Sequence, residues 1–167
     1  LEINIDKVYF DKIHTVKKLK GNLKIKNNNV VDANILAFYN DAKNISFTIR
    51  TTDQGNKITT IFSSLAKPLV SRYKFINGFK DDKDGFLDFY SSKKNGVSTS
   101  KLIIDNFKVK EIPVLAKLLA LASLQGIADL LTGEGIRFTD LEMNFTNKNK
   151  VMRIQELYVI GPAISIL

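Results

Sequence analysis

Alternating apolar and polar residues dominate the first sixty positions of the chain. Apolar side chains recur at every second position in short stretches, and asparagine, aspartate and glycine separate these stretches. A period of two is typical of strands with one packed and one solvated face, and these separating residues permit tight reversals. The pattern therefore predicts a meander of antiparallel strands. The apolar sets are Leu1, Ile3, Ile5; Leu19, Leu23, Ile25; Ile35, Ala37, Tyr39; and Ile45, Phe47, Ile49.

The period changes in the middle of the chain. Residues 63–74 predict a short helix, although Pro68 favours a break or a late start. The apolar and aromatic runs 75–79 and 85–90 flank a polar stretch that predicts a hairpin connection. A further strand is expected over residues 99–110.

Residues Pro113–Leu131 give the strongest helix signal. Proline occupies a suitable first position, and Gly133 follows the last leucine as a stop signal. Apolar side chains lie on nearly every side, so the helix must be covered by protein, by lipid or by a partner. A transmembrane span is disfavoured, because Lys117 and Asp129 shorten the uncharged run well below the ~20 residues that a bilayer requires.

These patterns predict an α+β fold in a single domain over residues 1–167. We expect one highly curved antiparallel sheet, a groove of roughly eight to eleven strands. The helix at Pro113–Leu131 and a shorter helix near Ser63 are expected to pack inside the curve or at its end. Because the chain starts at Leu1 and stops in an apolar, strand-like run, we expect it to be a fragment of a longer protein.

Charge and composition narrow the function classes. The formal net charge is +8, yet the lysines are dispersed and alternate with apolar residues, as in residues 19–26. A solvated strand face explains that spacing without an anionic partner. Aromatic residues such as Phe47 and Phe89 lie within alternating apolar patterns, which favours core packing over nucleic-acid stacking. The absence of cysteine excludes disulfides and thiolate metal sites.

Catalytic and cofactor patterns are not found in the sequence. His14 is the only histidine, so histidine-rich zinc sites cannot be built, and no G-x-S-x-G serine motif occurs. Residues 81–85 start like a calcium loop, but the alignment places Lys80 and Ser91 where acidic ligands are needed. Residues 133–138 begin like a dinucleotide fingerprint but lack its third glycine. The sequence therefore predicts neither an enzyme nor a cofactor.

The final third of the chain has a specific order of segments. Ile103–Phe107 (IIDNF) is followed by Ile112–Leu119 (IPVLAKLL) and Gly126–Gly133 (GIADLLTG), and then by Gly135–Phe138 (GIRF) and Gly161–Ala163 (GPA). This order resembles the AsmA-like C-terminal region of long Gram-negative envelope proteins, the relatives of AsmA, YhdP and TamB. The resemblance covers about the last hundred residues.

The resemblance implies lipid handling without catalysis. Members of that family are periplasmic proteins tethered to the inner membrane, and their curved sheets form an apolar groove. It implies phospholipid transport between the inner and outer membranes, or outer-membrane assembly and maintenance. The implied partners are phospholipid and the two membranes, with no nucleic acid and no cofactor. The expected lipid-binding residues are Leu115, Leu118, Leu119, Leu121, Leu124, Phe138, Met143 and Phe145.

Each of these eight residues also fits a closed protein core. The alternative function is therefore a structural or interaction module that pairs through its sheet edges and does not bind lipid. Unpaired strand edges would also allow the fragment to associate with itself. Burial distinguishes the two functions, because an open trough favours lipid and a sealed core favours the module.

Overall fold

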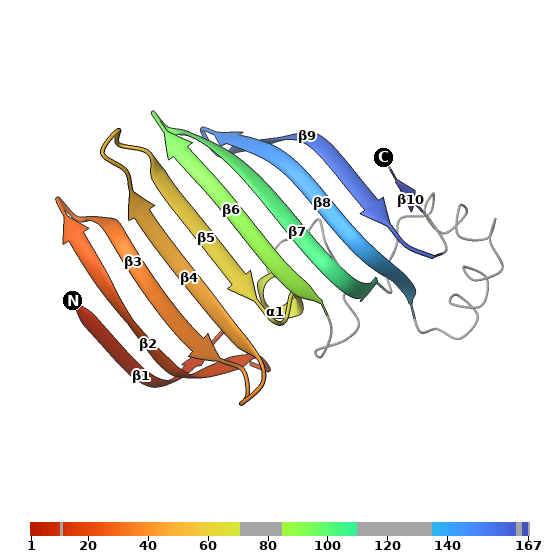
Figure 1. Ribbon diagram of the computed structural model, residues 1–167, viewed down its shortest axis with the longest axis horizontal. Coiled ribbons are helices and arrows are strands. Elements are labelled where there is room, and N and C mark those ends of the chain that lie inside the picture. The colour runs from red at the N-terminus through yellow and green to blue at the C-terminus, as the bar shows by residue number, and fades with distance from the viewer. Residues whose placement is uncertain (11, 71–84, 110–134, 163–164, 167) are drawn as a thin grey trace.

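The computed structural model describes residues 1–10, 12–70, 85–109, 135–162 and 165–166. Within these residues, ten strands form one antiparallel sheet in which the spatial order repeats the chain order (Figure 1). The strands are β1 (Glu2–Tyr9), β2 (Thr15–Lys26), β3 (Asn29–Phe38), β4 (Asn44–Thr51), β5 (Lys57–Ser63), β6 (Phe86–Lys94), β7 (Val97–Val109), β8 (Ile136–Lys148), β9 (Val151–Ile160) and β10 (Ser165–Ile166), and the helix α1 is Lys67–Val70.

Tight turns join several of the strands. Asn27–Asn28, Asn95–Gly96 and Asn149–Lys150 are two-residue connections in which both residues have φ between 49° and 77°. Two successive residues with positive φ define the type I′ turn, whose twist matches the twist of paired strands. The antiparallel meander predicted for the first sixty residues is confirmed, and the same topology continues to β10.

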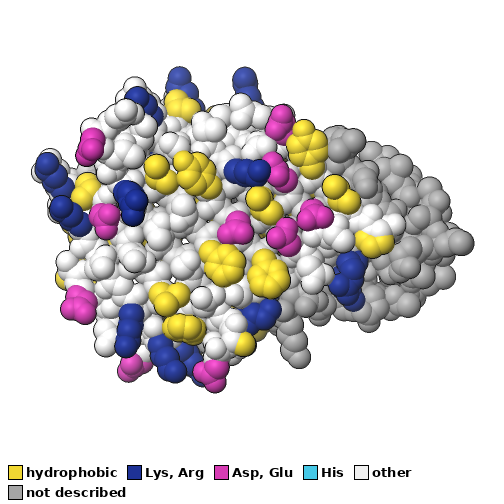
Figure 2. Space-filling view, in the orientation of Figure 1, with side chains coloured by type: hydrophobic (Ala, Val, Ile, Leu, Met, Phe, Trp, Pro, Cys, Tyr) yellow, Lys and Arg dark blue, Asp and Glu magenta, His cyan; other side chains and the backbone are white. Residues whose placement is uncertain are grey.

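The sheet has two unlike faces, because neighbouring side chains along a strand point to opposite sides. We call one the apolar face; it carries Ile35 of β3, Phe47 of β4 and Ile61 of β5, which pair across the strands. We call the other the polar face; residues such as Asn34 and Thr48 lie on it. Figure 2 shows hydrophobic side chains scattered among charged ones on the side facing the viewer.

The main core lies on the apolar face over β6 to β9, where α1 also packs. Its buried hydrophobic residues have exposed fractions of 9% or less. The Phe107 and Phe138 rings stack with centroids 5.3 Å apart. The core residues are Ala66, Val70, Leu87, Leu102, Ile104, Phe107, Ile136, Phe138, Leu141, Met143, Phe145 and Val159.

The predicted α+β fold with a highly curved sheet was wrong. The described residues are nearly all-β, and their sheet is neither closed nor strongly curled. Strong curvature requires bulges or glycine kinks repeated across a sheet. From β3 to β8 the strand register runs without a shift. Among the described residues, register shifts occur only between β2 and β3 and between β8 and β9. The strands at the middle of the sheet therefore lack the repeated register shifts that would curl it.

The helix predictions have different outcomes. Of the short helix predicted over residues 63–74, the described part contains only the four residues of α1, with Pro68 in its first turn. The helix predicted at Pro113–Leu131 and the polar connection between 75–79 and 85–90 lie outside the described residues. Of the strand predicted over residues 99–110, residues 99–109 belong to β7, and residue 110 lies outside the described residues. Among the described residues, no helix has the length and hydrophobicity of a membrane span.

The alternation of buried and exposed residues is interrupted once within β7 and once within β8. In β7 the buried positions pass from Ile104 to Phe107, and in β8 they pass from Phe138 to Leu141. Asn106 lies at the interruption in β7 with a φ of 50°. The interruption occurs at paired positions of the two strands, so the register between β7 and β8 is the same before and after it. The apolar face therefore remains continuous along the whole length of both strands.

Candidate functional site

The apolar face contains a first hollow of about 230 Å³ that crosses β1 to β5. Every described residue that lines this hollow is apolar. Several of them, including Ile35, Ile45 and Phe47, are only half-buried. The lining residues are Val8, Phe10, Val16, Leu19, Ile35, Ala37, Ile45, Phe47, Ile61 and Leu69.

A second hollow of about 380 Å³ crosses β5 to β9 on the same face. Its wall is mostly apolar, with serine and asparagine side chains on the strands. Two of the serines, Ser91 and Ser100, satisfy each other through a hydrogen bond of 2.9 Å. The lining residues are Ile61, Leu69, Val70, Leu87, Phe89, Ser91, Ser98, Ser100, Leu102, Met143, Phe145, Asn147 and Met152.

The two hollows meet at Ile61 of β5 and Leu69 of α1, because these two residues line both of them. We call the two hollows together the trough. It runs across the strands from β1 to β9. Such a shape suits an elongated apolar ligand better than a compact polar one.

Hydrogen bonds around Ser63 fix the chain where it leaves β5 for α1. The Ser63 hydroxyl donates to the Leu65 carbonyl oxygen at 2.6 Å and accepts from the Leu65 amide at 3.3 Å. A hydroxyl has one hydrogen, so the Tyr39 hydroxyl must be the donor in its 2.9 Å bond to Ser63. Burial raises the pKa of Tyr39.

The next residue ties the same segment to the start of β4. The Ser64 hydroxyl donates to the Asn44 side-chain oxygen at 2.9 Å and accepts from the Asn44 amide at 3.2 Å. The Ala66 amide then donates to the Gly85 carbonyl oxygen at 2.8 Å. These bonds hold the base of α1 against the sheet, and they position Leu69 over the trough.

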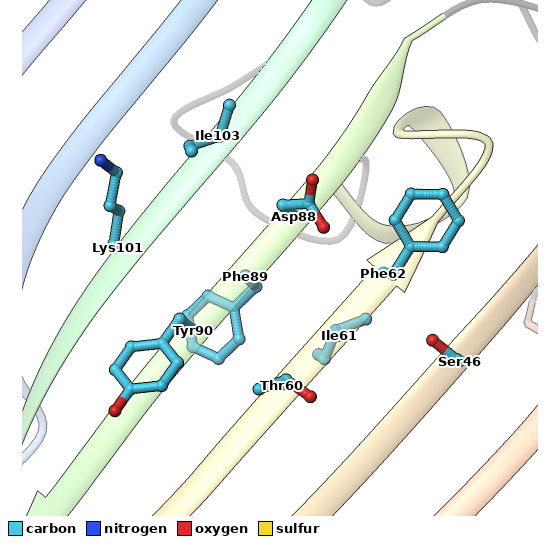
Figure 3. A pocket seen from close by; sticks show the side chains of 9 residues that line it. All are labelled: Ser46, Thr60, Ile61, Phe62, Asp88, Phe89, Tyr90, Lys101 and Ile103. Atoms are coloured by element: carbon cyan, nitrogen blue, oxygen red, sulfur yellow. The ribbon is translucent and has the colours of Figure 1, made fainter.

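The polar face carries a shallower hollow of about 280 Å³, shown in Figure 3. Asp88, Tyr90 and Lys101 are among its lining residues. The Lys101 ammonium contacts the Glu142 carboxylate at 2.7 Å, and this hydrogen bond holds the pKa of Glu142 below its ordinary value. The lysine charge is thus already paired, and this hollow is a weaker candidate than the trough.

Acidic side chains also meet on the polar face. Asp105 of β7 lies directly opposite Asp140 of β8. Burial raises the pKa of Asp105, and the charges of Asp140 and Asp88 raise it further. Across the described residues, no group of histidine, cysteine, aspartate and glutamate side chains has an arrangement that could hold a metal ion.

The structure separates the predicted lipid-binding residues into groups. Met143 and Phe145 line the second hollow, although only 3% and 8% of their surfaces are exposed. Phe138 is 5% exposed and stacks on Phe107 in the core without lining either hollow. The remaining predicted residues, Leu115, Leu118, Leu119, Leu121 and Leu124, lie outside the described residues.

The sequence prediction missed the N-terminal half of the trough. Val8, Ile35 and Phe47 line the first hollow, but no lipid contact was expected from them. The available signal was the alternation that predicted their strands, since it places these residues on one face. No protein-family model, no curated protein and no solved structure matches this chain.

Proposed function

We propose that this chain holds the acyl chains of phospholipids along the trough, as part of a periplasmic protein for lipid transport or outer-membrane maintenance. The first hollow carries the proposal, because every described residue lining it is apolar and several are half-buried. A face that served only as a closed core would bury such side chains more completely. Binding of this kind needs no bond to be made or broken.

The dimensions of the trough suit acyl chains. Neighbouring strands lie about 4.8 Å apart, so a path from β1 to β5 or from β5 to β9 spans roughly 19 Å. The hydrocarbon core of a bilayer is about 30 Å thick, so one chain occupies about 15 Å of it. Each hollow is therefore long enough for one chain. Each methylene moved out of water contributes about 0.8 kcal/mol.

The cellular part of the proposal comes from the resemblance to the AsmA-like region. It implies phospholipid as the ligand, the inner and outer membranes as partners and a tether in the inner membrane. The highly curved groove expected from that family is not needed for binding. The apolar face of a sheet that is not strongly curled can hold a chain in a hollow while the headgroup remains in water.

Lipid extraction tests the proposal directly. The natively purified protein is extracted with organic solvent, and phospholipid is quantified by mass spectrometry against an unrelated protein of similar positive charge. Ile35→Asp places a charge in the first hollow. Leu36→Asp is the matched control, because Leu36 is the next residue, is 39% exposed and lies on the polar face.

We expect stoichiometric phospholipid with the unchanged protein and with Leu36→Asp, and its loss with Ile35→Asp. Both variants change the net charge equally, so adsorption to the basic surface would affect them alike. Far-UV circular dichroism establishes that both remain folded. Phospholipid at the level of the unrelated protein in all samples would overturn the proposal.

One observation favours the second candidate function, a module that pairs through its sheet edges. β9 exposes 68% of Val151 and 50% of Ile154, which is unusual for large apolar side chains on a strand. β10 pairs only with Val159 and Ile160 among the described residues, so another strand could pair along the rest of β9, and its own side chains would partly cover Val151 and Ile154. Absence of lipid together with concentration-dependent association in sedimentation analysis would support this module.

A further inference from the structure

Leu69 occupies a special position in the trough. It is the residue of α1 that lines both hollows, and Ile61 is its counterpart on the sheet. Its helix neighbours Ala66 and Val70 are buried in the core, with exposed fractions of 0% and 2%, whereas Leu69 is only partly buried. The Leu69 side chain thus stands where the two hollows meet.

We infer that Leu69 divides the trough and limits the length of acyl chain that each hollow accepts. This inference rests on the proposed lipid binding and adds a specificity-determining residue to it. A linear chain that enters one hollow reaches the Leu69 side chain after crossing four strand spacings, roughly 19 Å. Methylenes beyond that point have to stay in water or displace Leu69.

The base of α1 is fixed well enough for Leu69 to act as a barrier. The Ala66 amide is bonded to the Gly85 carbonyl oxygen at 2.8 Å, and the Leu69 amide donates to the Ala66 carbonyl oxygen at 3.1 Å. Gly85 has a φ of +85°, and a side chain there would come within 3.2 Å of Ala66. The residue before α1 is therefore packed closely against Gly85 and bonded to it, which fixes the position of the helix start.

A barrier has a distinctive effect on affinity. Each added methylene that enters an apolar site tightens binding about fourfold. Affinity should rise by this factor along a series of chain lengths and then level off where the chain meets Leu69. The chain length at which affinity stops rising, which we call the cutoff, reports the position of the barrier.

The experiment measures the cutoff with lysophosphatidylcholines of about eight to about eighteen carbons, by displacement of a fluorescent fatty acid below their micelle concentrations. The unchanged protein is compared with Leu69→Ala, which opens the barrier, and Leu69→Phe, which enlarges it. Leu36→Ala is the matched control, since it removes the same atoms from the polar face. Urea unfolding of each variant establishes that it is folded.

We expect Leu69→Ala to move the cutoff to longer chains, so that chains beyond the original cutoff bind at least about fourfold more tightly than before. Leu69→Phe should move it to shorter chains, and Leu36→Ala should leave it unchanged. An identical cutoff in all four folded proteins would overturn the inference while leaving lipid binding intact. No displacement by any chain length in the unchanged protein would overturn both.

Discussion

The Ser63 hydroxyl supports the start of α1, and its removal gives the sharpest test of the structure. Ser63 is completely buried, and its hydroxyl donates one hydrogen bond and accepts two. Ser63→Ala removes the hydrogen-bond partner of the Leu65 carbonyl and of the Leu65 amide, and it also removes the acceptor of the Tyr39 hydroxyl. Tyr39→Phe removes only the bond between the two side chains.

The expected magnitudes follow from these bonds. A buried polar group left without a partner costs about 1–3 kcal/mol, and a net hydrogen bond contributes about 0.5–1.5 kcal/mol. Ser63→Ala should lower the free energy of unfolding by about 2–4 kcal/mol, and Tyr39→Phe by about 0.5–1.5 kcal/mol. Both single variants lose the same hydrogen bond. The loss of stability in the double variant should therefore be about 1 kcal/mol smaller than the sum of the losses in the two single variants.

Urea unfolding followed by far-UV circular dichroism measures all four proteins, because the chain has no tryptophan to report by fluorescence. With a slope of about 2 kcal/mol per molar urea, Ser63→Ala should lower the midpoint by about 1–2 M. Additive losses within about 0.3 kcal/mol would refute the reasoning, because they would mean that the two hydroxyls do not interact.

Three further outcomes are expected. Because burial raises the pKa of Tyr39, the unfolded state loses the phenolic proton at a lower pH than the folded state does. The free energy of unfolding should therefore fall above about pH 10 in the unchanged protein and fall less in Tyr39→Phe. Urea titrations at a series of pH values measure this difference. Burial and the charge of Asp140 raise the pKa of Asp105, which means that the ionised form of Asp105 is disfavoured in the folded protein. Asp140→Asn removes one of the two facing charges and should increase the free energy of unfolding by a few tenths of a kcal/mol at low salt, a small value because these groups are exposed to solvent. Unchanged or lower stability would contradict the pairing of Asp105 with Asp140. A side chain at Gly21 would clash with the Asn34 carbonyl oxygen, so Gly21→Ala should lower the thermal midpoint. Gly55→Ala should lower it less, because only the positive φ of Gly55 opposes that change. Equal losses in the two variants would argue against the close approach of β2 and β3.

The strands could be predicted because their signal is local. Period-two apolar sets around Ile35 and Ile45 place alternate residues on one face, and a strand needs little more than that. Asparagine pairs such as Asn27–Asn28 mark turns because asparagine tolerates positive φ. The same alternation could have identified the first hollow, had the apolar sets been read as one continuous surface.

The shape of the sheet could not be predicted, because it depends on relations between strands. Curvature follows from bulges, and the sequence gives no local sign of where registers shift or stay constant. The interruption of the alternation at Asn106 keeps the apolar face continuous because β8 is interrupted at the same level. The ring contact between Phe138 and Phe107 has no local signal either, since the two residues are thirty-one positions apart in sequence.

The strand order of the sheet has a consequence for how the molecule opens. Each described strand pairs only with strands that precede or follow it directly in the chain, so the sheet can assemble one neighbouring pair at a time. β1 pairs with a single described strand, and its separation breaks one ladder and leaves the others intact. Backbone amides of β1 should therefore exchange with solvent through local opening of that strand. The amides of β7 and β8 should exchange only when the whole sheet unfolds.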